Sequence, residues 1–163
     1  MTIKKFIHFY FFQMMALTSA AIGLLIRVQS FQGWYEALNK PWFAPTENML
    51  IASWILIHIF LGVTAYILWH DEYDKTAPNP EAKHLLGLLP LQLILSFGWT
   101  ALFFGLELPL WAFVDRVITL LLLFYIFRHS LKVSKFVSTY YIVYIFWVLY
   151  QMTFNLSIIF LNK

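Results

Sequence analysis

Polar and apolar positions divide the chain into five long apolar runs joined by more polar connections. Each run reaches the length of about 20 residues that a helix needs to cross the hydrocarbon core of a bilayer. Strands of a membrane barrel would be only about ten residues long and would alternate strictly between polar and apolar side chains. The pattern therefore predicts an all-α membrane protein, a single domain with a bundle of five transmembrane helices over residues 6–26, 49–69, 85–104, 108–127 and 136–161.

The four connections between these runs differ in character. Residues 28–48 are long and unusually aromatic, whereas residues 70–84 are polar, contain two prolines and are expected to form a solvated loop. Residues 105–107 allow only a tight turn, so the third and fourth helices are expected to be antiparallel neighbours. Residues 128–135 are short and basic. Pro90 is expected to kink the third helix near its start, because proline removes a backbone donor and crowds the preceding turn.

The composition supports a membrane protein and excludes several kinds of functional site. The chain is 61% hydrophobic and 12% charged, whereas soluble domains are about 25% charged. The absence of cysteine excludes disulfides, thiolate nucleophiles and cysteine-based metal sites. Basic residues lie at the ends of apolar runs, which favours membrane anchoring over nucleic-acid binding. The run after Lys4 and Lys5 has the start of a secretion signal but no small-residue cleavage site, so we expect a retained helix.

Basic residues outside the runs are unevenly divided between the two ends of the predicted bundle. The end with the N-terminus carries Lys4, Lys5, Lys75, Lys83, Arg128, Lys132 and Lys135. The opposite end carries Arg27, Lys40 and Lys163. Because positive charge is retained on the cytoplasmic side, we expect a cytoplasmic N-terminus and an aromatic connection on the outer face. No Arg- and Ser-rich transit peptide precedes the first run, which favours a bacterial cell membrane.

Polar and aromatic residues inside three of the runs recur at helical spacing. The fifth helix carries Tyr140, Tyr144, Trp147, Gln151 and Asn155 on one face. The third carries Gln92, Ser96, Trp99 and Phe103, with Thr100 beside them. The second carries Trp54, His58 and Ala65. Such faces are explained either by hydrogen bonds between helices or by an aromatic ligand cavity with a few polar groups.

Three ionisable residues within the runs have both structural and functional interpretations. His58 is expected to be a hydrogen-bonded interior residue, with axial ligation of a metal-tetrapyrrole as the alternative. No second histidine or glutamate stands at metal-binding helical spacing, so no protein metal site is expected. Asp115 and Arg116 point about 100° apart on a helix, so we expect no simple pair, with one side chain facing the bundle and the other the interface. A structural role is expected there, with proton relay or transport as the alternative.

Several motifs together resemble the TspO/MBR family, the tryptophan-rich sensory proteins of bacteria and the mitochondrial translocator proteins. The most specific is LQLILSFGWTALFFG, from Leu91 to Gly105, which resembles the family pattern LQLxLNxxWSxLFFG. The aromatic connection matches the pattern WYxxLxKPxWxPP at Trp34, Tyr35, Leu38, Lys40, Pro41 and Pro45. Further matches are Trp54, Gly62, Tyr66, Trp69, Asp115, Tyr144, Trp147 and Asn155. Departures at Phe43, Thr46, His58, Ser96, Arg116 and Val143 bear on ligand preference more than on fold.

The resemblance implies a bundle with an apolar cavity beneath the aromatic connection, which would act as its lid; an interfacial aromatic belt is the alternative for this segment. It also implies a homodimer in the membrane, no required cofactor, and porphyrins such as protoporphyrin or haem as ligands, with sterols or benzodiazepine-type drugs as further candidates. The propionates of a porphyrin would need donors near the mouth, where Arg27 and Lys40 are candidates; contact with lipid headgroups is the alternative for either residue. Some bacterial members promote breakdown of porphyrin by light and oxygen, and the two tryptophans associated with that chemistry map onto Trp54 and Trp147.

Three functions remain open from the sequence: binding, sensing or transport of tetrapyrroles or similar apolar ligands; an enzyme of porphyrin degradation with Trp54 and Trp147 in catalysis; and a membrane scaffold. The residues predicted to line the ligand site are Tyr35, Pro45, Trp54, His58, Gln92, Ser96, Trp99, Thr100, Phe103, Asp115, Tyr144, Trp147, Gln151 and Asn155.

Overall fold

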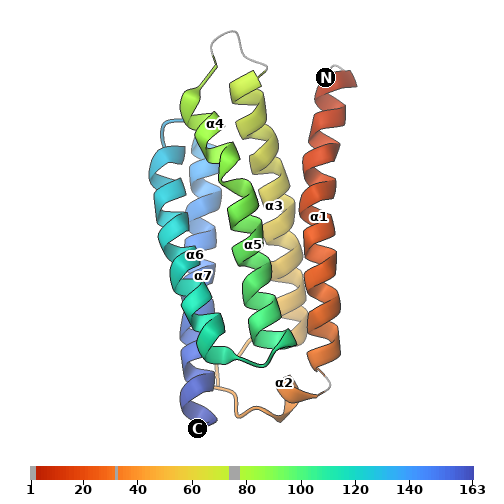
Figure 1. Ribbon diagram of the computed structural model, residues 1–163, viewed down its shortest axis with the longest axis vertical. Coiled ribbons are helices and arrows are strands. Elements are labelled where there is room, and N and C mark those ends of the chain that lie inside the picture. Colours follow the sequence, from red (N-terminus) through yellow and green to blue (C-terminus); the bar gives the residue numbers. More distant parts are fainter. Residues whose placement is uncertain (1–2, 32, 74–77) are drawn as a thin grey trace.

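The computed structural model describes residues 3–31, 33–73 and 78–163 and consists of helices (Figure 1). These are α1 (Ile3–Phe31), α2 (Trp34–Ala37), α3 (Glu47–Tyr73), α4 (Pro80–Gly87), α5 (Leu89–Thr100), the π-helix η1 (Ala101–Gly105), α6 (Pro109–Ser130) and α7 (Lys135–Leu161). Five of the resulting segments are long and apolar enough to cross a membrane, with α4, α5 and η1 together forming one of them. The predicted fold class, an all-α membrane bundle of five spanning helices, is confirmed.

The connection expected over residues 70–84 is largely helical. α3 continues through Tyr73, and α4 begins at Pro80. Asn79 caps α4 by accepting a hydrogen bond from the Glu81 backbone N–H at 3.0 Å, and Pro80 occupies a first-turn position where its missing N–H has no cost. The expectation of a solvated loop was therefore wrong at both ends of this segment, and residues 74–77 lie outside the described residues.

Pro90 interrupts the third span near its start. α4 ends at Gly87 and α5 begins at Leu89, with Leu88 between them. The proline ring has no N–H to donate and would crowd the carbonyl four residues earlier. The expected kink is present as a break between two helices.

The spanning helices form a closed ring (Figure 1). In order around the bundle, α1 packs against α3, α3 against α7, α7 against α6, α6 against α5, and α5 against α1. The N-terminus and α4 lie at one end, which we call the α4 end, and the C-terminus and α2 lie at the other, the lid end. Since α5 and α6 are joined by the short turn after η1, they are the antiparallel neighbours that the sequence predicted.

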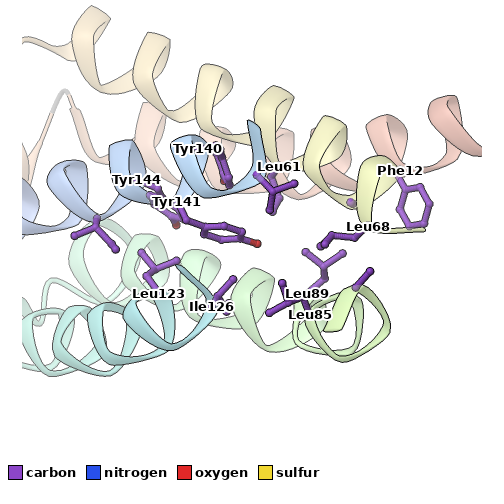
Figure 2. Close-up of a cluster of buried hydrophobic side chains, with 14 of the residues drawn as sticks. Phe12, Leu61, Leu68, Leu85, Leu89, Leu123, Ile126, Tyr140, Tyr141 and Tyr144 are labelled. Atoms are coloured by element: carbon purple, nitrogen blue, oxygen red, sulfur yellow. The ribbon is translucent and has the colours of Figure 1, made fainter. Parts of the chain in front are cut away.

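The apolar core has two parts. Near the α4 end, side chains from all five spans meet, among them Phe12, Leu68, Leu89, Ile126 and Tyr141 (Figure 2). A more aromatic cluster at the lid end contains Phe31, Tyr35, Trp99, Phe103, Phe104 and Phe154. Many large apolar side chains on the outer surface are exposed, as expected for helices that face lipid.

The end of the third span is wound as a π-helix. The Leu106 N–H donates to the Ala101 carbonyl at 2.8 Å, five residues back. Glu107 then adopts a left-handed backbone with φ of 57°, and α6 starts at Pro109. Phe103 and Phe104 are both buried in this wider turn, where they form part of the surface on which the aromatic connection rests.

Candidate functional site

The aromatic connection, residues 33–46, covers the lid end of the bundle and is called the lid below (Figure 1). Tyr35 is its inner anchor, with ring centres 5.5 Å from Phe104 and 6.4 Å from Phe154. The Tyr35 hydroxyl donates to the Pro45 carbonyl at 3.3 Å. Burial raises the pKa of Tyr35 to about 12, so the phenol keeps its proton and remains a donor at neutral pH.

Hydrogen bonds fasten the lid to α7. The Asn39 N–H donates to Asn162 Oδ1 at 2.9 Å, and Asn162 Nδ2 donates back to the Asn39 carbonyl at 3.0 Å. Farther along the lid, the Tyr150 hydroxyl donates to the Phe43 carbonyl at 3.0 Å. Trp42 points outward and is 96% exposed. The lid thus has an inner aromatic side that seals the bundle and an outer tryptophan suited to the membrane interface.

Lys40 holds the lid in shape. Its ammonium group donates to the backbone carbonyls of Tyr35 at 2.6 Å and Glu36 at 3.0 Å. A cation at this position satisfies carbonyls that the short helix α2 leaves free. The charge is therefore already engaged with the lid backbone.

A cluster of charged, polar and indole side chains lies at the centre of the bundle. We call it the arginine–tryptophan centre; its members are Arg27, Trp54, His58, Trp99, Thr100, Asp115 and Arg116. All seven are buried, and they come from α1, α3, α5 and α6.

Arg27 is the most unexpected member, because it was predicted at the mouth or among lipid headgroups. It is 1% exposed, and its guanidinium carbon lies 4.1 Å from the Trp54 ring centre and 5.2 Å from that of Trp99. Its two terminal nitrogens donate to the Leu50 carbonyl at 3.3 Å and to Thr100 Oγ1 at 3.1 Å. The predicted position was wrong because α1 extends to Phe31, which places Arg27 inside the bundle and not at its edge.

The Trp54 indole is held in place from two sides. Its Nε1–H donates to the Ala20 carbonyl at 2.9 Å. Gly23, one turn further along α1, presents no side chain to the ring, and an added Cβ would lie only 2.7 Å from it. Close approach of α1 and α3 at this level therefore depends on the glycine.

Asp115 and Arg116 form an ion pair, contrary to the expectation that they would not. Arg116 Nη2 and Nε donate to Asp115 Oδ2 at 2.7 and 3.2 Å. Arg116 also donates to the Leu95 carbonyl at 2.7 Å and is 1% exposed. Both residues are buried, so neither reaches the interface. The long arginine side chain reaches the carboxylate of its neighbour, and the pair is favoured because an unpaired buried carboxylate would be far more costly.

His58 has one engaged and one open ring nitrogen. Its Nδ1 lies 2.9 Å from the Trp54 carbonyl. A carbonyl only accepts, so Nδ1 carries the proton and Nε2 is left as a lone-pair acceptor. That Nε2 atom is buried without a hydrogen-bond partner. Within the described ranges, no three His, Cys, Asp or Glu side chains are grouped to hold a metal ion.

The polar faces predicted on separate helices do meet one another. Among the hydrogen bonds that join α7 to α5 and α6 are those from Tyr141 to Gln92 (3.0 Å), Tyr144 to Ser96 (3.4 Å), Arg116 to Gln151 (3.4 Å) and Trp99 to Asn155 (3.0 Å). Tyr141 was not part of the predicted face. For the predicted residues Tyr144, Gln151 and Asn155, and for their partners on α5, the interpretation as interhelical hydrogen-bonding groups is confirmed. Their role toward a ligand stays a prediction.

The remaining predicted site residues lie around this centre or apart from it. Pro45, within the lid, is buried, and its carbonyl accepts from Tyr35. The Phe103 ring stacks on Trp99 with centres 5.4 Å apart. Trp147 is only partly buried and has its ring 5.2 Å from that of Tyr150. The second tryptophan of the predicted catalytic pair is thus not among the members of the arginine–tryptophan centre.

Three hollows in the described part of the chain lie outside the arginine–tryptophan centre. One of about 450 Å³ opens at the lid end between Trp34, Trp111 and Ile158. One of about 160 Å³ separates Phe60 of α3 from Tyr140 of α7. One of about 410 Å³ lies on the outer surface between α1 and α5. The side chains that line them do not include Trp54, Trp99 or Trp147, and the Arg27 guanidinium covers the first two of these indoles.

A signal for Arg27 was present in the sequence. The residues of α1 that are buried include Ala16, Ala20, Gly23 and Arg27, at spacings of 4, 3 and 4 along the chain. That is one helical face, and its small residues indicate close helix packing. The arginine lies on this face and not on the lipid side.

Comparison with known proteins gives consistent matches. The sequence pattern of the TspO/MBR family matches residues 11–161. A tryptophan-rich protein TspO of Archaeoglobus fulgidus is 31% identical over 144 residues, 86% of this chain and 87% of the relative. A protein of the same description from Chlorobaculum tepidum is 28% identical over 129 residues, 79% of each chain. A translocator protein of Ovis aries is 35% identical over 96 residues, 58% of this chain and 53% of the relative.

Proposed function

Because this chain belongs to the TspO/MBR family of membrane proteins, we propose that it binds a flat apolar ligand of the tetrapyrrole class within its bundle, in a sensing or transport role. Protoporphyrin and haem are the leading candidate ligands. The binding site is the arginine–tryptophan centre beneath the lid.

One observation carries the proposal: two tryptophans from different helices, Trp54 and Trp99, share one cation at the centre of the bundle. Indole faces stack well on flat π-systems. In a well-packed interior, buried polar atoms are almost always paired. Here His58 Nε2 and Gln92 Nε2 are not, so polar atoms of a ligand would find partners among them.

Entry of such a ligand requires side chains to move. The Arg27 guanidinium covers the indole faces that a ligand would stack on, and the lid closes this end. Arginine has a long, flexible side chain, and the lid is held to α7 by few hydrogen bonds. Withdrawal of Arg27 together with loosening of the lid would open the site.

The geometry favours binding over porphyrin breakdown as the primary function. Trp54 is buried against Arg27 and His58, whereas Trp147 is half-buried beside Tyr150. The two tryptophans named for catalysis therefore have different surroundings. No observation specifically supports a scaffold role, because such a role does not explain why polar atoms are buried without hydrogen-bond partners.

Titration of the purified protein with protoporphyrin tests the proposal through tryptophan fluorescence. We expect saturable quenching that exceeds quenching of free tryptophan in protein-free micelles. Trp54→Phe and Trp99→Phe should each remove part of the quenched signal. Trp69→Phe is the matched control, since Trp69 stacks on His8 toward the α4 end. Absence of saturable quenching in a folded sample would contradict the proposal.

A further inference from the structure

Arg27 is a buried cation without a carboxylate partner. The ion pairs that the structure records within the described residues involve other side chains, and the centre contains two guanidinium groups but one carboxylate, that of Asp115. Asp115 is already paired with Arg116 at 2.7 Å. An arginine stays charged at any physiological pH. The centre therefore carries an excess positive charge inside a membrane-spanning bundle.

The contacts of Arg27 compensate this charge only in part. Two neutral oxygens, of Leu50 and Thr100, accept from its terminal nitrogens. The rings of Trp54, Trp99 and Phe104 lie within 5.2 Å of its guanidinium carbon, and ring faces attract cations. None of these groups bears a negative charge. Buried charges in proteins are normally paired with an opposite charge.

The Nε–H of Arg27 is a hydrogen-bond donor without an acceptor. The Nε atom is buried and has no hydrogen-bond partner. Water does not supply one from outside, because Arg27 is only 1% exposed. A guanidinium presents Nε and a terminal nitrogen side by side, and this edge matches the two oxygens of a carboxylate. The free edge of the Arg27 guanidinium therefore has the donor geometry that suits a planar anion with two oxygens.

We propose that Arg27 selects ligands that combine an apolar body with a carboxylate, and that it pairs with that carboxylate inside the bundle. The inference rests on the proposed function, because it assigns a charge to the ligand of the same site. Once Arg27 withdraws from the indole faces, the apolar body would stack against Trp54 and Trp99, and the carboxylate would pair with the Nε edge of the displaced guanidinium. The carboxylate could belong to a porphyrin propionate or to a fatty acid, and the experiment distinguishes the two.

Comparing protoporphyrin with its dimethyl ester tests whether binding requires the carboxylate charge, because the two ligands share the same porphyrin ring. Hydrogen bonds to a charged group are stronger than neutral ones, so we expect wild type to bind the free acid about tenfold or more tightly than the ester. In Arg27→Gln the ratio of the two affinities should fall to about onefold, whatever the affinity for the ester itself. Arg27→Lys should recover part of the preference, since it keeps the charge and loses the planar fork.

Arg128→Gln is the matched control, because it removes an exposed guanidinium in the last turn of α6. It should leave the preference of wild type unchanged. A cooperative thermal unfolding transition with wild-type helix content shows that Arg27→Gln is folded. Competition of bound protoporphyrin by palmitate, but not by methyl palmitate, would assign the site to fatty carboxylates as well; no competition would restrict it to porphyrins.

Two kinds of result would overturn the inference, and they have different consequences for the proposed function. Equal binding of acid and ester by wild type, or a preference that survives in Arg27→Gln, would reject the role of Arg27 and leave the proposed function intact. Failure of wild type to bind either porphyrin would reject the proposed function itself, and this inference with it.

Discussion

Gly23 fixes where the Trp54 indole lies. A methyl group at this position would stand 2.7 Å from Cζ2 of the ring, well inside van der Waals contact. The ring has little freedom to retreat, because its Nε1–H is bonded to Ala20 and the Arg27 guanidinium covers its face. One absent side chain on α1 thus positions one wall of the proposed ligand site.

Gly23→Ala is expected to destabilise the protein by about 1–3 kcal/mol, the usual cost of overpacking a core. It should also weaken protoporphyrin binding, since Trp54 would be displaced. Thermal unfolding in detergent and the quenching titration measure the two effects. The matched control is Gly87→Ala, where an added Cβ meets nothing within 4 Å. Equal melting temperatures for Gly23→Ala and wild type would contradict this account of the packing.

At the scale of elements, the lid is the part of the structure most open to local release. The reciprocal hydrogen bonds between Asn39 and Asn162 and the bond from Tyr150 to Phe43 connect it to α7. Its inner side is held by the burial of Tyr35. A segment with few buried contacts opens at a lower free energy than the bundle beneath it.

Asn162→Ala should loosen the lid without unfolding the bundle. It removes both hydrogen bonds to Asn39, and each is worth about 0.5–1.5 kcal/mol. Amide hydrogen exchange across residues 34–46 should therefore accelerate about tenfold, while exchange in α6 stays unchanged. Asn48→Ala, at an exposed position in the first turn of α3, is the control. Unaltered exchange of the lid in Asn162→Ala would show that the hydrogen bonds between Asn39 and Asn162 do not keep it closed.

At the scale of the whole molecule, the positive charges gather at the α4 end. Burial of Arg27 leaves Lys40 and Lys163 as the described cations near the lid end. Lys4, Lys83, Arg128, Lys132 and Lys135 lie toward the α4 end. Since cytoplasmic loops are enriched in lysine and arginine, the α4 end is expected to face the cytoplasm and the lid the opposite side.

Single cysteines test this orientation, because the native chain has none to interfere. We expect Asn48→Cys, at the lid end, to react with a membrane-impermeant maleimide in intact cells. Lys83→Cys, which is exposed on α4, should react only after permeabilisation. Labelling in denatured samples controls for thiol reactivity. The reverse pattern would show that the lid faces the cytoplasm.

Sequence reasoning was most successful for features that depend on short stretches of chain. Helix length and continuous apolar character identified all five spans, and helical spacing identified the buried faces of α5 and α7. It was least successful at helix ends. Polar residues at 70–73 and 80–84 read as a loop, yet they continue α3 and form α4, because interfacial helix ends need not be apolar.

The sequence by itself determined the membrane bundle, the number of spans and which polar groups turn inward, because hydrophobic length and periodicity are local properties. Only the tertiary structure decided that Arg27 lies against two indoles, that Asp115 pairs with its neighbour Arg116, and that the lid is bonded to Asn162. These arrangements join residues from different helices or depend on the surroundings of a long side chain. A buried charge takes the partner that folding brings within reach, and spacing along the chain does not reveal which partner that is.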